Sequence, residues 1–177
     1  SFCMLASGIL SFYWSESVGY ALVLSAIITF LSGILFSVTA MHFRDGHVGK
    51  RESFSVVTLT WVLMSFFGMF PFYISNAIPN ITDAYFETMS GFSATGATIF
   101  TDIESVPRGL LLWRSLTQWI GGIGIIVFAL VLLPMMGGNA SVLYEAETTG
   151  MVQEKFRPRI GQVAKHLFAS YCLLTII

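Results

Sequence analysis

Long apolar runs alternate with short polar segments along the whole chain. Residues 18–41, 54–74 and 108–133 are each long enough to cross a hydrocarbon core of about 30 Å as a helix, which takes about 20 residues. Residues 2–14 form a shorter run, which we interpret as the outer part of a first helix cut off at its beginning. A further apolar run starts near residue 162. The pattern predicts an all-α integral membrane protein.

The segment between the third and fourth spans, residues 80–107, breaks this pattern. Residues 81–90 can form about three helical turns, roughly 15 Å, which is half of the hydrocarbon thickness. We predict that the helix stops at Gly91, because glycine adopts the left-handed conformation at little cost. The loop at 91–99 is rich in Gly, Ser and Thr. A half-length helix and loop between two spans is typical of a re-entrant pore loop, and a surface turn between two helices is the other interpretation.

Backbone carbonyls in such a loop are candidate ligands for a cation. Irregular backbone at membrane depth persists only when it is buried in protein or lines a wet cavity. In potassium channels, rings of carbonyls replace the hydration shell of the ion, and the loop aligns with the filter TVGYG, Thr95 taking the Val position and Gly96 the first Gly. The partly negative carbonyl end of the preceding helix points toward this loop. The predicted K⁺ ligands, with Thr95 and Gly96 as the firmest, are the carbonyls of Ala94, Thr95, Gly96, Ala97 and Thr98.

Composition and charge support a membrane protein and suggest its orientation. The chain is 55% hydrophobic and only 11% charged, whereas soluble domains carry about 25% charged residues. Basic residues concentrate in the loops 43–52 and 135–160, which the positive-inside rule makes cytoplasmic. The pore mouth then faces outward under an acidic rim, which would concentrate cations, although each acid could equally be an ordinary solvated loop residue. The predicted rim comprises Glu16, Asp83, Glu87, Asp102 and Glu104.

A serine hydrolase within the membrane is the rival function. Gly91 and Ser93 match the start of a nucleophile elbow, but Thr95 stands where its second glycine is required. A nucleophilic serine also needs a base within hydrogen-bond reach. The histidines are predicted to be cytoplasmic, opposite to the outward-facing Ser93, and they are His42, His47 and His166. We therefore expect no enzymatic activity.

Several other features have structural interpretations. The glycines at 121–124 lack the G-x-G-x-x-G spacing of a dinucleotide site, so we expect no organic cofactor and interpret them as a packing site or a bend. Pro71 predicts a kink near the end of its span. Arg114 lies within a span, where it is expected to pair with Glu87 or a loop acid, or to extend outward. A stripe of small residues in the second span predicts a packing face, formed by Ala21, Ser25, Thr29, Gly33 and Ser37.

Three stretches together resemble a known family: YFETMSGFSATGATIF, LLWRSLTQWIGGIGIIVFALVLLP and FRPRIGQVAK. They resemble the first pore repeat of the TrkH-type potassium transporters of the Trk/Ktr/HKT superfamily, most strongly over residues 41–165. The resemblance implies four non-identical helix–pore loop–helix repeats, with two helices in front, and makes the chain an N-terminal fragment. On that plan the chain divides into two N-terminal helices (1–42), the first repeat (53–134), a cytoplasmic loop (135–160) and the start of the second repeat (161–177).

The resemblance also implies a filter chemistry and partners. Each repeat of the family has one filter glycine, here Gly96, while Thr98 occupies the position of the second glycine of TVGYG. In relatives, glycine rather than serine at this site accompanies selectivity for potassium over sodium. The expected setting is a multi-pass protein of the bacterial inner membrane, a homodimer with one pore per protomer, contacting lipid and a TrkA-like cytosolic nucleotide-binding ring subunit, and binding no nucleic acid. Passive conduction and symport both fit, and a single-repeat subunit that assembles as a tetramer is the alternative.

Overall fold

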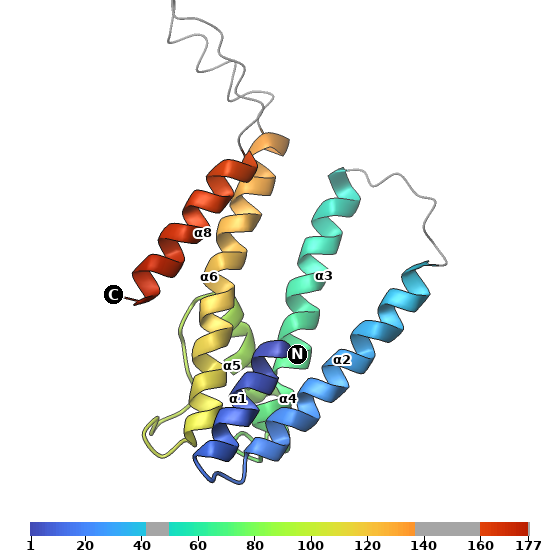
Figure 1. Ribbon diagram of the computed structural model, residues 1–177. Coiled ribbons are helices and arrows are strands. Elements are labelled where there is room, and N and C mark those ends of the chain that lie inside the picture. Colours follow the sequence, from blue (N-terminus) through green and yellow to red (C-terminus); the bar gives the residue numbers. More distant parts are fainter. Residues whose placement is uncertain (42–49, 137–159, 177) are drawn as a thin grey trace, which may run out of the picture. The chain divides into compact units, whose positions relative to one another are not determined.

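The structure is a computed structural model that describes residues 1–41, 50–136 and 160–176. The regular elements within these ranges are all helices, which confirms the predicted all-α class (Figure 1). The chain divides into two compact units, Ser1–Gly121 and Gly122–Ile177. The helices are α1 (Phe2–Tyr13), α2 (Gly19–Met41), α3 (Lys50–Gly68), α4 (Phe70–Ile74), α5 (Ile81–Phe92), α6 (Arg108–Met136) and α8 (Ile160–Ile176).

Two stretches of the described residues are long and apolar enough to cross a membrane. They are Gly19–Ala40 in α2 and Ser55–Ile74, which covers most of α3 and all of α4. Both agree with spans predicted from the sequence. Helix α6 has 29 residues, and therefore extends roughly 43 Å. Most of the predicted cytoplasmic loops, together with His42 and His47, lie outside the described residues.

Near the predicted kink at Pro71, the helix is interrupted at a single residue, Met69, between α3 and α4. Proline has no N–H to donate to the carbonyl four residues earlier. The N–H of Phe72 bonds to Met69 O at 3.1 Å rather than to Gly68 O, its partner in a continuous helix. The indole N–H of Trp113 in α6 donates to Gly68 O instead, at 3.0 Å. The broken end of α3 is thus completed by a side chain from α6.

The small-residue stripe of α2 packs against its neighbours along only part of its length. Ala21 and Ser25 are fully buried. Gly8 of α1 lies so close that a Cβ atom there would contact Val23 Cγ2 at 3.0 Å. A Cβ at Gly33, in contrast, would meet nothing within 4 Å. The predicted packing face is therefore confirmed for the first half of the stripe, where α1 covers α2.

The turn between α1 and α2 holds the first turn of α6. Glu16 Oε1 accepts the backbone N–H of Arg108 at 2.8 Å, and Oε2 accepts that of Gly109 at 2.9 Å. The hydroxyl of Ser11 donates to the same carboxylate at 3.1 Å. The first N–H groups of a helix have no partner within the helix, and a carboxylate there satisfies them and complements the helix dipole. Glu16 is thus a helix cap and not a free charge of the predicted rim.

Unit Ser1–Gly121 has one apolar core, to which α1, α2, α4, α5 and α6 contribute. Its fully or nearly fully buried members include Met4, Leu22, Ala26, Met69, Phe72, Ala84, Phe92, Leu110 and Trp113. In the other unit, a Cβ at Gly122 of α6 would collide with the hydroxyl of Tyr171 in α8. Gly122 therefore lies at a close contact with a side chain of α8, which favours packing over a bend, the two alternatives predicted for this cluster.

Candidate functional site

Helix α5 is the short helix that the sequence predicted. It begins at Ile81, and the side chain of its N-cap residue Asn80 accepts the N–H of Thr82 at 3.1 Å. Asp83 lies in the first turn, where a negative charge complements the helix dipole. The 12 residues of α5 extend about 18 Å, which is well short of a bilayer.

The predicted helix stop at Gly91 is wrong, since α5 continues to Phe92. Gly91 is buried in the helix, where a Cβ atom would collide with Thr117 Oγ1 of α6. Close approach of two helices, rather than a left-handed conformation, therefore requires this glycine. The left-handed residues come later, at Ala94 with φ 55° and Gly96 with φ 76°.

The loop after α5 folds back over the end of the helix. The N–H groups of Thr95 and Gly96 both point to Ser90 O, at 3.0 and 3.4 Å. Beyond the turn at Ser93 and Ala94, residues 95–100 have no regular structure. The loop is therefore non-helical, as predicted, and Ser90 O at the end of α5 is already hydrogen-bonded.

The five predicted carbonyl ligands fall into two groups. Gly96 O accepts a hydrogen bond from Arg114 Nη2 at 3.4 Å, and Ala97 O accepts one from the Ser90 hydroxyl at 2.6 Å. Within the described part of the chain, no hydrogen bond reaches the carbonyl oxygens of Ala94, Thr95 or Thr98. Residues 94–97 are exposed. Three of the five carbonyls are therefore free to bind a ligand.

Glu87 is at the centre of a buried polar cluster. The residue is 2% exposed, and its carboxylate accepts Arg114 Nε at 2.6 Å. It also accepts the Thr98 hydroxyl at 3.0 Å and the N–H of Ile99 at 2.9 Å. Of the alternatives for Arg114, pairing with Glu87 is thus confirmed, whereas the placement of Glu87 in an acidic rim is wrong. A buried carboxylate needs such partners because desolvation is costly.

Two residues beside the loop were not singled out from the sequence. Ser90 bonds to Ala97 O, and Gln118 Nε2 would lie 3.2 Å from a Cβ at Gly96. The available signal for Ser90 was its spacing, because residues three apart on a helix share a face, and Ser90 follows Glu87 by three. Gln118 follows Arg114 by four residues on α6, and residues four apart on a helix also share a face.

Three predicted rim acids remain near the surface. Asp102 and Glu104 are exposed and Asp83 is half-buried. Asp102 Oδ1 accepts the N–H of Glu104 at 3.1 Å, so the pair forms a local turn. A shallow pocket of about 270 Å³ is lined by Asp83, Asp102 and Phe100, among others. The described residues contain no group of three potential metal-binding side chains.

The geometry around Ser93 does not favour the hydrolase. Its hydroxyl lies 2.8 Å from Thr95 Oγ1 and donates to Ser90 O at 3.3 Å. The described residues of its unit include no histidine. Its interactions therefore stay within the loop, and the general base that a serine nucleophile requires is not among them.

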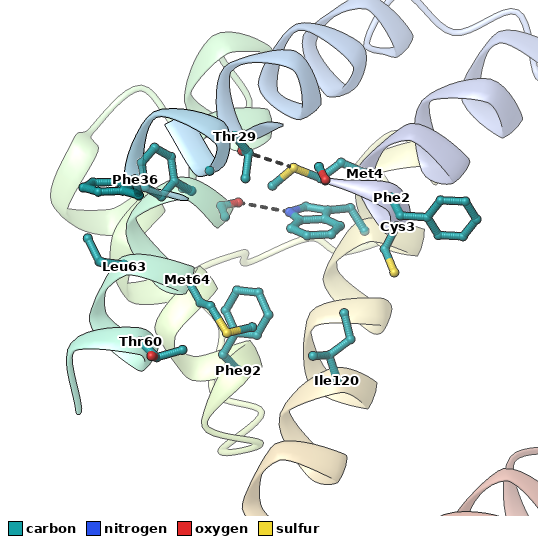
Figure 2. Close-up of a pocket in the computed structure, with 15 residues that line it drawn as sticks. Phe2, Cys3, Met4, Thr29, Phe36, Thr60, Leu63, Met64, Phe92 and Ile120 are labelled. Carbon is teal, nitrogen blue, oxygen red and sulfur yellow. Dashed lines mark hydrogen bonds between the residues drawn. The ribbon is translucent and has the colours of Figure 1, made fainter. Parts of the chain in front are cut away.

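A larger cavity of about 570 Å³ is lined by residues of α1, α2, α3, α5 and α6. Figure 2 shows Met4, Met64, Phe92 and Ile120 around it, together with the contact between Thr29 and Met4. Its lining is mostly apolar. Its side-chain oxygens are those of Ser1, Thr29 and Thr60, and its described lining includes no carboxylate of the kind that hard cations prefer.

The chain matches known transport proteins along most of its length. The model of the TrkH family, described as a cation transport protein, matches residues 24–177. The chain is 43% identical over 136 residues to the Trk system potassium uptake protein TrkH of Escherichia coli K12, which covers 75% of this chain and 28% of that protein. It is 34% identical over 178 residues to the protein of the same name from Halomonas elongata. That match covers 99% of this chain and 37% of the Halomonas protein.

A third relative carries a different name. The Trk system potassium uptake protein TrkG of E. coli K12 is 38% identical over 129 residues, which cover 71% of this chain and 26% of that protein. The chain spans between 26% and 37% of the length of these three relatives. The family match and the apolar helices together identify a membrane protein, and the chain belongs to the TrkH family of cation transport proteins.

Proposed function

We propose that the protein containing this chain takes up potassium across the membrane, and that residues 91–99 contribute one segment of its selectivity filter. The observation that carries the proposal is the exposed, non-helical backbone of Ala94 and Thr95, whose carbonyls have no partner among the described residues. The names of the relatives, which are potassium uptake proteins, support the same ion. Potassium is the transported substrate here, and its passage makes and breaks no covalent bond.

The proposed ligands are backbone oxygens, with Thr95 O as the principal one and Ala94 O beside it. A cation competes poorly for a carbonyl that already accepts a hydrogen bond from a positively charged guanidinium. Gly96 O and Ala97 O, which accept bonds from Arg114 and Ser90, are therefore weaker ligands in this arrangement. Gly96 has a second role, because its φ of 76° lies in the region that favours glycine.

The remaining expectations about the whole protein belong to the same proposal. The relatives are about three times as long as this chain, which leaves room for the three further repeats of a four-repeat pore. We propose that the loops 43–52 and 135–160 face the cytoplasm and the pore mouth faces outward. A homodimer that binds a cytosolic nucleotide-binding ring subunit is the proposed assembly.

The test is cation uptake by the full-length protein in bacterial cells that lack other potassium uptake systems. Potassium, rubidium, sodium and lithium are compared for the wild type, Gly96→Ser and Gly96→Ala. We expect the wild type to prefer potassium, and Gly96→Ser to lower the potassium-to-sodium uptake ratio by about tenfold, since one weakened polar contact changes affinity by this order.

The matched variant Gly96→Ala separates two causes of that change. Both replacements impose about 1–2 kcal/mol of left-handed strain and bring a Cβ to 3.2 Å from Gln118 Nε2. Equal effects would assign the change to the backbone, and a larger effect of Ser would assign it to the hydroxyl. Wild-type cells without potassium uptake, or a Gly96→Ser variant with unchanged rate and ratio, would contradict the proposed function.

A further inference from the structure

Four consecutive residues of the loop are each fastened to a helix. Arg114 of α6 donates to Gly96 O, and Ser90 of α5 donates to Ala97 O. Glu87 of α5 accepts both the Thr98 hydroxyl and the N–H of Ile99. The loop therefore has a fastened half at 96–99, beside a half with the free carbonyls of Ala94 and Thr95; within the fastened half, Thr98 is held by its hydroxyl and its carbonyl accepts no hydrogen bond from the described residues.

Three of the four fastened residues, all but Ala97, are held by the buried Glu87 or by its partly buried partner Arg114. Joining two helices does not require charge, because well-packed apolar residues of similar volume are often as stable as a buried ion pair. Glu87 is 2% exposed and its two oxygens accept three donors, from Arg114, Thr98 and Ile99. Each helix thereby reaches the loop through its charged member. The pair thus acts on the loop backbone as well as on helix packing.

Arginine is the side chain that fits this arrangement. Its planar guanidinium presents several donors in a fixed fork, whereas lysine carries one compact ammonium on a flexible stem. Here Nε donates to Glu87 Oε1 at 2.6 Å while Nη2 points to Gly96 O at 3.4 Å. One rigid group thus contacts both the Gly96 carbonyl and the carboxylate that holds Thr98 and Ile99.

We propose that Glu87 and Arg114 are positioning residues that hold the loop at the spacing suited to potassium. This inference rests on the proposed function of the loop. A filter discriminates ions through the placement and number of its carbonyl dipoles. When the fastened half of the loop is released, the adjacent carbonyls of Ala94 and Thr95 can close around the smaller sodium ion. Loss of either charged residue therefore lowers the preference for potassium over sodium.

The test uses the full-length protein and the uptake assay described above. The variants are Glu87→Gln, Arg114→Gln, Arg114→Lys and the double variant Glu87→Gln/Arg114→Gln. Each is expected to lower the potassium-to-sodium ratio by about tenfold, the size of one lost charge-assisted hydrogen bond. The double variant is expected to be no worse than a single one, because the two residues act as one unit.

Matched controls come from the same region of the chain. Arg108→Gln removes an exposed arginine at the start of α6, and Glu104→Gln removes an exposed acid of the loop that precedes it. Both are expected to keep the wild-type ratio within about twofold, since screened surface charges contribute little. An equal fall of the ratio in these controls would overturn the positioning role of the pair.

A second measurement separates positioning from a general structural role. Purified wild-type protein in detergent is expected to unfold at a higher temperature in potassium than in sodium, because a bound ion stabilises the folded state. The pair variants are expected to lose this difference, even where their unfolding temperature falls in both salts. Variants of Glu87 or Arg114 that keep the wild-type difference in unfolding temperature between potassium and sodium would overturn the proposal. The measurement can also be made on variants that take up no ion.

The two proposals fail in different ways. If Gly96→Ser changes the uptake ratio and the pair variants keep both the ratio and the potassium-dependent stabilisation, the positioning role is overturned and the proposed function stands. If the wild type neither takes up potassium nor is stabilised by it, the proposed function fails, and the positioning role fails with it.

Discussion

Arg114 Nε of α6 donates to Glu87 Oε1 of α5 at 2.6 Å, and the two side chains are 19% and 0% exposed. Twenty-seven residues of sequence separate them. Charged side chains in the interior of a membrane protein are costly and are retained in pairs or at functional sites. We interpret Glu87 and Arg114 as meeting both conditions, because they pair across two helices and also contact the candidate filter loop.

Breaking the ion pair on one side is expected to destabilise the protein strongly. Glu87→Ala leaves Arg114, the Thr98 hydroxyl and the N–H of Ile99 without their acceptor, which we expect to cost about 3–5 kcal/mol. Thermal or denaturant unfolding in detergent measures the change. Glu104→Ala, at an exposed site, serves as the control, and an equally small effect of both variants would contradict the prediction.

The indole of Trp113 is expected to stabilise the break between α3 and α4. Trp113→Phe can keep the edge-to-face contact with Phe92, whose ring centroid lies 6.4 Å away, but leaves Gly68 O without a donor. A buried carbonyl without a partner costs about 1–3 kcal/mol. Trp61→Phe is the matched control, since Trp61 is half-buried and no described residue accepts a hydrogen bond from its indole. Equal unfolding temperatures of the two variants would count against this role.

Replacement of a helix glycine by alanine is expected to destabilise the protein at Gly121 and to stabilise it at Gly33. A Cβ at Gly121 would collide with the backbone carbonyl of Phe92, which no side-chain rotation can relieve, so Gly121→Ala should cost about 1–3 kcal/mol. Gly33→Ala meets nothing within 4 Å and should gain up to about 1 kcal/mol of helix propensity. Unfolding temperatures measured in one detergent check both. A stable Gly121→Ala variant would show that α5 and α6 pack less closely than described.

Replacements of Glu16, which caps α6, are expected to lower the unfolding temperature by different amounts. Glu16→Gln keeps an oxygen acceptor but loses the charge, whereas Glu16→Ala leaves the N–H groups of Arg108 and Gly109 without their acceptor. Losing a helix cap costs about 0.5–2 kcal/mol. We therefore expect unfolding temperatures in the order wild type, Gln, Ala. If the alanine variant unfolds at the wild-type temperature, solvent satisfies these groups and the cap is dispensable.

Much of the local structure could be predicted from the sequence. The apolar spans follow from composition and length, and the short helix at 81–90 follows from its length together with its flanking polar residues. Pro71 indicated the break in its span, since its missing N–H acts within one turn. These features depend on neighbours along the chain, and the sequence contains those neighbours directly. Only their boundaries changed, as with α5, which ends at Phe92 instead of Ser90.

The roles of Gly91, Glu16 and Glu87 were predicted incorrectly for a common reason. Each depends on a partner from a distant part of the chain: Thr117 for Gly91, Arg108 for Glu16 and Arg114 for Glu87. A glycine that permits helix contact and a glycine that ends a helix are identical in sequence. Likewise, the sequence does not distinguish a solvated acidic residue from one that is buried with a partner.

The sequence by itself determined the class of protein, the helices, the loop between them and the resemblance to a transporter family, because hydrophobicity and local backbone preference act over a few residues. Only the tertiary structure decided which carbonyls of the loop are free and which are held. That division arises where α5 and α6 bring Glu87, Ser90 and Arg114 against one side of the loop. Hydrogen bonds form only over about 3 Å, so they require the folded arrangement of both helices.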